Sequence, residues 1–135
     1  MTKTVETRLE IKSWDEMPYR ELEDGRKFTK ANVVLAGSEG DLRGEATWEA
    51  LMYYAADGTG TYVGLMQVTG RLGERSGSFV MQGSGTYDGK QARVESFVVP
   101  GSGTDELTGL SGTSVSVSTH EDYPFWPLTL TYDIE

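Results

Sequence analysis

FVVPGSGTDELTGLSG, residues 97–112, is the stretch that decides the fold. A run of β-branched and aromatic residues ends at Pro100, and a Gly-Ser-Gly segment follows it. Gly101 and Gly103 can adopt positive φ angles at no steric cost, so the chain can turn sharply out of a strand here. The stretch therefore predicts a corner between two strands.

A single helical turn is expected in the second half of this corner. Thr104 stands in the N-cap position, and two acidic residues follow it in the first turn, where the positive end of a helix favours them. Gly109 then ends the turn. Leu107 and Leu110 are the apolar side chains of the segment, and we expect both to be buried as a plug that closes one end of a β-barrel.

The rest of the chain reads as a series of strands joined by turns. Ala56-Asp57-Gly58 separates two β-rich runs, which is a strong signal for a hairpin. The predicted strands are residues 5–11, 27–36, 42–55, 59–72, 77–87, 90–99, 111–119 and 126–135. No helical period exceeds one turn. The sequence therefore predicts an all-β fold, an eight-stranded antiparallel β-barrel in which closure removes the edge strands, formed by residues 1–135 as a single domain.

The segment 14–25 interrupts the strand pattern with Pro18 and an acidic turn, and it predicts a loop. Its large apolar side chains are Trp14, Met17, Tyr19 and Leu22. A loop this apolar is expected to pack over the barrel mouth.

Composition and charge exclude several classes of function. The chain has 135 residues, no cysteine and a net charge of −9. No apolar run is long enough for a transmembrane helix or a signal peptide, so a cytoplasmic protein is expected. The acidic balance argues against nucleic acid and anionic membrane surfaces as partners. The acids stand in short groups beside turns, which favours a solvated surface over calcium ligation.

Strand parity predicts which side chains point into the barrel. The expected inward set is Trp48, Ala50, Met52, Tyr54, Tyr62, Gly64, Met66, Val68, Phe79, Met81, Gly83, Val94, Ser96, Val98, Leu128, Leu130 and Tyr132. Parity places Glu49 and Glu95 outside, and in residues 111–119 it places Ser114, Ser116 and Ser118 on the wet side, opposite in face to Val115 and Val117. His120, the only histidine, is interpreted as a bystander in a loop. No P-loop, dinucleotide fingerprint, HExxH or G-x-S-x-G motif is present.

Six short motifs carry a family resemblance: W-D-E-x-P at 14–18, G-E-A-T at 44–47, L-M-Y-Y at 51–54, Y-V-G-L at 62–65, G-S-F-V-M-Q at 77–82 and the corner itself. With them the chain resembles a bacterial family of unknown function that has the allene oxide cyclase-like barrel, a calycin-type, lipocalin-like architecture. The corner is also similar to that of plant allene oxide cyclases and dirigent proteins. The resemblance implies a barrel with an apolar interior, commonly oligomeric, in a superfamily whose enzymes need no metal or nucleotide cofactor.

The chain departs from this family pattern at three positions. Met66 stands where an acidic residue is common, Gly83 where histidine is common, and Ser96 where a large aromatic residue is common. The chain lacks the family's chemistry if those positions carry it. The smaller side chains at 83 and 96 are expected to enlarge the cavity, which fits either a divergent ligand or a re-engineered lumen.

A site at the barrel mouth is expected, because small-molecule sites favour apolar and aromatic linings with a few polar groups. The candidate ligand-binding residues are Trp14, Tyr19, Trp48, Met52, Tyr54, Tyr62, Met66, Met81, Gly83, Ser96 and Tyr132. Tyr54, Tyr62 and Tyr132 could offer phenol groups to a ligand.

Three functions stay open at this stage. One is a cofactor-free cyclase or isomerase, or a lyase-type proton-transfer enzyme, acting on a small hydrophobic molecule. A second is a non-catalytic carrier of such a molecule. A third is a structural oligomeric module with a filled lumen. A homo-oligomer is expected from the resemblance and from Val63 and Leu65, which parity places outside the barrel.

Overall fold

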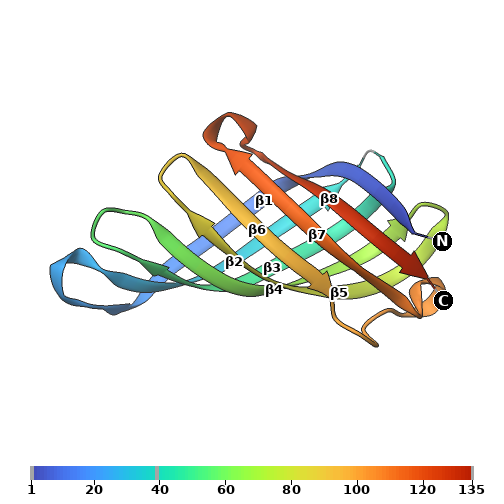
Figure 1. The fold of residues 1–135 in the computed structure, drawn as a ribbon, viewed down its shortest axis with the longest axis horizontal. Coiled ribbons are helices and arrows are strands. Elements are labelled where there is room, and N and C mark those ends of the chain that lie inside the picture. The colour runs from blue at the N-terminus through green and yellow to red at the C-terminus, as the bar shows by residue number, and fades with distance from the viewer. Residues whose placement is uncertain (1, 39, 135) are drawn as a thin grey trace.

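The computed structural model describes residues 2–38 and 40–134 and forms a closed antiparallel barrel in which the strands neighbour each other in chain order (Figure 1). The strands are β1 (Lys3–Glu21), β2 (Lys27–Gly37), β3 (Leu42–Tyr54), β4 (Gly60–Leu72), β5 (Arg75–Tyr87), β6 (Gln91–Val98), β7 (Leu110–Thr119) and β8 (Phe125–Ile134). Three single turns of helix connect them: η1 (Glu23–Gly25), η2 (Asp105–Leu107) and η3 (His120–Asp122). The predicted all-β, eight-stranded barrel is confirmed. No helix among the described residues is long and apolar enough to cross a membrane.

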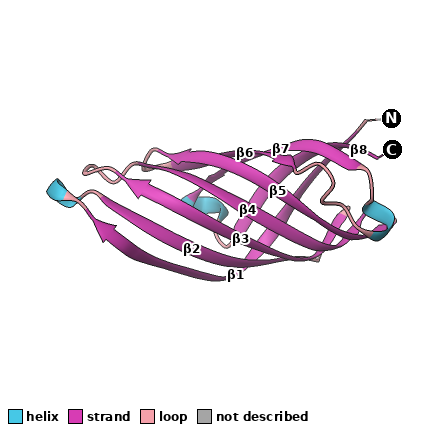
Figure 2. Cartoon of the chain, turned by 90° about the horizontal axis from the view of Figure 1, so that it is seen from below, coloured by secondary structure: helices cyan, strands magenta, loops and turns pink. Residues whose placement is uncertain are grey.

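β1 closes the barrel by pairing with two different strands along its length. From Lys3 to Glu10 it pairs with β8, and from Glu10 to Glu21 it pairs with β2. Beyond Glu10, β1 therefore leaves β8 and continues beside β2 alone, while β2 stays paired with β3 along its whole length; the ribbon of β1 and β2 ends in η1 at one tip of the molecule (Figures 1 and 2).

The loop predicted for residues 14–25 is wrong, because β1 continues to Glu21 and only a tight turn follows. Two register shifts in the pairing with β2, between Ile11 and Ser13 and between Pro18 and Arg20, break the alternation that would have identified a strand. Pro18 is tolerated there because this part of β1 pairs on one side only, so no ladder hydrogen bond is lost on the free edge.

The first register shift turns the following side chains to the other face of β1. Ile11 lies opposite Leu35 and Ser13 opposite Val34, so Lys12 is one extra residue in β1. Residues directly opposite in an antiparallel pair share a face. Trp14 lies opposite Val33 and Glu16 opposite Ala31, and both partners are buried inside the barrel. The bulge thus directs Trp14 and Glu16 inward.

The plug at the corner is confirmed. Leu107 and Leu110 are only 1% and 2% exposed. Gly101 has a φ of 82°, as the turn requires. Gly103 serves a different purpose from the one expected: a Cβ there would collide with the carbonyl oxygen of Leu107, so glycine allows a close approach of two chain segments.

Thr104 does not cap η2 with its side chain, which corrects the expected N-cap. Its hydroxyl instead accepts a hydrogen bond from the backbone N–H of Ser78 at 3.0 Å, and its own N–H donates to the Ser78 carbonyl at 2.9 Å. These contacts fasten the corner to β5. The corner lies at the same end of the barrel as the two termini, and the β3–β4, β5–β6 and β7–β8 turns lie at the other end (Figure 1).

The predicted inward set is confirmed in β3, β4, β5, β6 and β8. The large inward side chains are buried, including Trp48, Met66, Phe79 and Leu130. On the outer surface, Val63 and Leu65 are 56% and 50% exposed, as expected. Self-association through such residues stays a prediction.

In β7 the expected orientation is wrong: Ser114 and Ser116 are only 6% and 4% exposed, whereas Val115 and Val117 are 37% and 39% exposed. Ser114 lies opposite Ser96 and Leu130, which face inward, so the serines of β7 share the inner face.

Removing the plug should destabilise the barrel. Leu107→Ala is expected to lower the free energy of unfolding by about 2–5 kcal/mol, because it leaves a cavity under a fully buried side chain. Leu65→Ala, at an exposed position, is the control and should change it by less than about 0.5 kcal/mol. Urea denaturation measures both. Equal, small losses in the two variants would show that the corner is not a plug.

Candidate functional site

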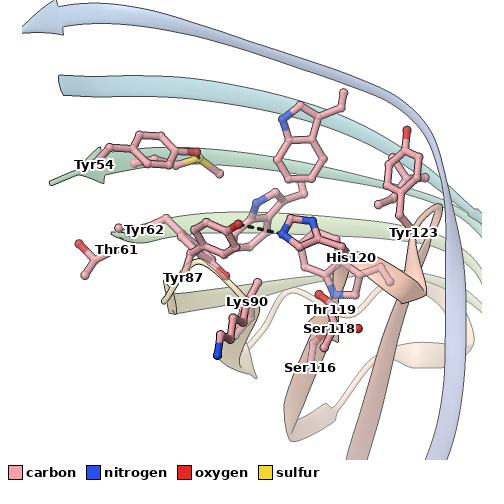
Figure 3. Close-up of a pocket in the computed structure, with 18 of the residues that line it drawn as sticks. Tyr54, Thr61, Tyr62, Tyr87, Lys90, Ser116, Ser118, Thr119, His120 and Tyr123 are labelled. Carbon is pink, nitrogen blue, oxygen red and sulfur yellow. Dashed lines mark hydrogen bonds between the residues drawn. The ribbon is translucent and has the colours of Figure 1, made fainter. Parts of the chain in front are cut away.

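A cavity of about 290 Å³ opens at the end of the barrel opposite the corner (Figure 3). Its wall is mainly aromatic, with Trp14, Trp48, Tyr53, Tyr54, Tyr62, Tyr87, Tyr123, Phe125 and Trp126. The other lining residues are Ile11, Met52, Gly60, Thr61, Lys90, Ala92, Val94, Ser116, Ser118, Thr119 and His120. All of these residues together come from six strands, β1, β3, β4, β6, β7 and β8, from the last residue of β5, from the β5–β6 turn, and from η3 and the segment that joins it to β8.

Trp48 forms the floor of this cavity and is 2% exposed. Its ring meets Trp126 edge-on at 5.5 Å between centroids and Tyr62 edge-on at 6.5 Å, arrangements that aromatic pairs prefer. Glycine makes room for these rings: a Cβ on Gly64 would lie 2.9 Å from the Trp48 ring, and one on Gly85 would lie 2.6 Å from the Tyr62 ring. The floor is therefore closely packed and apolar.

A carboxylate fixes the polar groups on the β1 to β3 side of the mouth. The Tyr54 hydroxyl donates to Glu16 Oε2 at 2.7 Å, and the Thr29 hydroxyl donates to the same oxygen at 2.7 Å. The indole Nε1 of Trp14 donates to Glu16 Oε1 at 3.0 Å. Glu16 is half-buried and Thr29 is buried. This cluster follows directly from the bulge at Lys12, without which Glu16 would face outward.

Two phenols of the pocket hold their protons more tightly than usual. Burial, and next the hydrogen bond to Glu16, raise the pKa of Tyr54 well above its ordinary value. Burial alone raises the pKa of Tyr62 to about 12. Both side chains are therefore neutral phenols at physiological pH.

A second polar pair, Tyr87 and His120, lies in the wall of the pocket (Figure 3). The Tyr87 oxygen is 3.0 Å from His120 Nε2 and 3.1 Å from the Gly89 carbonyl oxygen. A phenol has one proton, so both contacts form together when Tyr87 donates to Gly89 and the Nε2–H of His120 donates to Tyr87. The ring interpreted from sequence as a bystander thus lies in the pocket wall.

The structure brings together five of the predicted site residues, Trp14, Trp48, Met52, Tyr54 and Tyr62. Met66, Met81 and Ser96 lie deeper, around a void of only about 10 Å³. Tyr19 is 56% exposed and stacks on Phe28 at 6.0 Å between centroids, away from the cavity. Tyr132 lies near the other end of the barrel, beside Asp41 and Leu72.

The extra space expected at Gly83 and Ser96 is absent. A Cβ on Gly83 would lie 2.8 Å from the Cβ of Ser96, its partner across the strands. The Ser96 hydroxyl is 2.9 Å from that of Ser114, so its side chain is engaged as well. Small residues at these positions allow close strand packing and do not widen the cavity.

Sequence reasoning missed several lining residues. Trp126 had a usable signal, because it shares its parity with Leu128 and Leu130 on β8. Tyr87, Lys90 and His120 stand at strand ends and turns, where parity gives no guidance. Glu16, which holds Tyr54 but does not itself line the cavity, had no signal, because the bulge that turns it inward breaks the strand pattern as a loop would. No group of His, Asp and Glu among the described residues is arranged to hold a metal ion.

Fold and site together define an antiparallel β-barrel with an aromatic pocket at one open end. The chain belongs to the family described as protein of unknown function (DUF3224), whose model matches residues 5–132. The crystal structure of a protein of unknown function from the DUF3224 family of Shewanella oneidensis MR-1 is similar, with a TM-score of 0.79 and 27% sequence identity, covering 100% of this chain and 99% of that one. No curated protein matches. The predicted membership of a family of unknown function is confirmed, whereas the allene oxide cyclase-like subtype stays a prediction.

Filling the space beside Ser96 should damage the fold. Ser96→Trp is expected to cost about 1–3 kcal/mol or more, because the adjoining void of about 10 Å³ cannot hold an indole. Ser84→Trp, on the exposed face of the neighbouring strand, is the control and should stay near the wild-type stability. Urea denaturation compares the two. A Ser96→Trp variant as stable as the control would mean that the lumen is not closely packed at this level.

The raised pKa of Tyr54 predicts a loss of stability at high pH. Its phenolate is disfavoured in the folded state, so this contribution is complete below about pH 10, the ordinary pKa of tyrosine, and is lost as the pH rises toward the folded value. Tyr54→Phe should therefore lose less stability between about pH 9 and about pH 11 than the wild type. Urea midpoints at the two pH values measure this, with Tyr123→Phe as the control for loss of one exposed phenol. Equal losses in Tyr54→Phe and the wild type would contradict the prediction.

Proposed function

We propose that this protein binds one small, largely apolar molecule in the pocket at the open end of the barrel. The observation that carries the proposal is the 290 Å³ cavity walled mainly by aromatic side chains. Ligand pockets are apolar and aromatic with a few placed polar groups, and their volumes run from roughly 300 to 1,000 Å³. The cavity lies at the lower end of that range, which favours a compact ring compound over a long acyl chain.

The polar groups of the pocket support the same proposal. Tyr54 is held by Glu16 at 2.7 Å, and Tyr87 is held by Gly89 and His120. Each hydroxyl is thus fixed in the empty protein by partners within the chain. Fixed groups lower the entropic cost of orienting a ligand, which favours specific binding.

A cofactor-free isomerase or cyclase is the second candidate, favoured by the Tyr87 and His120 pair in the wall. Two hydrogen-bonded groups that can donate and accept protons beside an apolar cavity suit proton transfer on a bound molecule. The expected likeness to allene oxide cyclases agrees with this candidate. Mass spectrometry of an organic extract of the purified protein would identify a bound molecule, and its conversion by the wild type but not by His120→Phe would separate an enzyme from a carrier.

Blocking the pocket tests the binding function. Ser118 lines the cavity and Val117, its neighbour on β7, faces outward with 39% exposure. Ser118→Trp should weaken binding of the fluorescent probe N-phenylnaphthylamine by at least about tenfold, because the new ring occupies the ligand's volume. Val117→Trp is the matched control and should bind the probe as the wild type does.

The titration is followed by the rise in probe fluorescence, and circular dichroism shows that both variants remain folded. Equal affinities in wild type and Ser118→Trp would mean that the probe binds elsewhere. The mouth pocket would then not be the binding site.

A further inference from the structure

We propose that the ligand carries an amine or a similar strong hydrogen-bond donor, rather than a carboxylate, and places it against the Tyr54 hydroxyl that Glu16 holds. This inference rests on the proposed function, because it names the ligand class for the same pocket. Three features of the mouth carry it: the direction of the Tyr54 hydrogen bond, the charge behind it and the aromatic rings beside it.

The Tyr54 hydroxyl is available to a ligand only as an acceptor. It has one proton and two neighbours, Glu16 Oε2 at 2.7 Å and the Met52 sulfur at 3.4 Å. A carboxylate is a far stronger acceptor than a thioether, so the proton points to Glu16. The lone pairs that remain on the Tyr54 oxygen attract a donor and repel the oxygen atoms of an anion.

Negative charge at Glu16 adds to this polarity. The carboxylate accepts from Trp14, Thr29 and Tyr54, and each of these donors is neutral. Among the described residues no lysine, arginine or histidine forms an ion pair with it. Glu16 does not itself line the cavity, so its charge acts on a ligand through Tyr54, where it favours an ammonium group.

The aromatic wall favours a cation as well. Cations are attracted to the faces of Trp and Tyr rings, and such rings recognise ammonium ligands. Lys27 uses one of these rings in this way, with its Nζ 5.4 Å from the Tyr54 centroid. The net charge of −9 draws cationic ligands toward the protein in general.

Of the lysines and arginines that the structure describes, only Lys90 lines the cavity. It stands on the β5–β6 turn, and in Figure 3 it lies on the far side of Tyr87 from Tyr54. The mouth thus has an acceptor side at Tyr54 and a donor side at Lys90 and His120. An amine seated on the first side leaves the apolar body of the ligand over Trp48 and Trp126.

Three probes that share one ring system test this polarity: naphthylmethylamine, naphthylmethanol and naphthylacetate. Isothermal titration calorimetry near neutral pH should show the amine binding at least about tenfold more tightly than the carboxylate, with the alcohol between them, as charged hydrogen bonds predict. Glu16→Gln should reduce amine binding by about tenfold, because the charge is lost and the amide can now donate to Tyr54. Tyr54→Phe should also weaken the amine while keeping the ring.

Glu49→Gln is the matched control. It removes the same charge from the exposed outer face of β3, so it reports any general attraction of cations to the acidic protein. It should leave the preference for the amine unchanged. A loss of preference as large as that in Glu16→Gln would overturn the inference.

The outcomes separate the inference from the function beneath it. If the alcohol binds in the wild type but the amine has no advantage over the carboxylate, the inference is wrong and the binding function stands. If none of the three probes binds, the binding function fails and the inference fails with it. Circular dichroism of Glu16→Gln and Tyr54→Phe shows that an altered preference arises in a folded barrel.

Discussion

The pairing of β1 with two partners is the constraint on which the rest of this structure depends. Its first half completes the barrel against β8, and the last link between them is the bond from the Ile11 N–H to the Pro124 carbonyl at 2.7 Å. Its second half pairs only with β2, so one side of the barrel ends early and the mouth stays open. Closure and the pocket are therefore two consequences of one long strand.

A row of small inward residues explains why side chains fill the lower lumen, whereas the mouth holds a cavity. Across successive strands, one inward row consists of Ala31, Ala50, Gly64, Gly83, Ser96 and Ser114. From sequence, the small residues at 83 and 96 suggested an enlarged cavity. In the structure they let the large side chains of the adjacent layers, above all Trp48, lie across the axis. The Trp48 ring then separates the closely packed lower barrel from the pocket above it.

Much of the fold could be predicted because its signals are local. The Asp57-Gly58 hairpin, the inward set of β3, β4, β5, β6 and β8 and the two leucines of the corner each depend on a few adjacent residues, and all are confirmed. In β7 the same reasoning placed the serines outside, because the sequence does not show that Ser114 and Ser116 find hydrogen-bond partners inside the barrel. The bulge at Lys12 could not be predicted, because a strand with an extra residue and a loop break alternation in the same way. Trp14 and Tyr54 could be named from sequence, but Glu16 and its bonds to them are visible only in the folded chain.

The contacts of Glu16 link the register of β1 to the hydrogen-bonding character of Tyr54 in the pocket. Its donors come from β1, β2 and β3, so one carboxylate bonds to side chains of three neighbouring strands. The Thr29 hydroxyl is buried and needs this partner, since an unpaired buried hydroxyl costs about 1–3 kcal/mol. A change in the register of β1 on β2 would move Glu16 away from Tyr54 and Thr29, because the bulge at Lys12 sets where Glu16 stands. The bond that orients the Tyr54 proton would then be lost, and Thr29 would lose its partner. The acceptor character of Tyr54 thus depends on the strand register that the bulge fixes, while the continuous ladder between β2 and β3 holds Tyr54 and Thr29 in place.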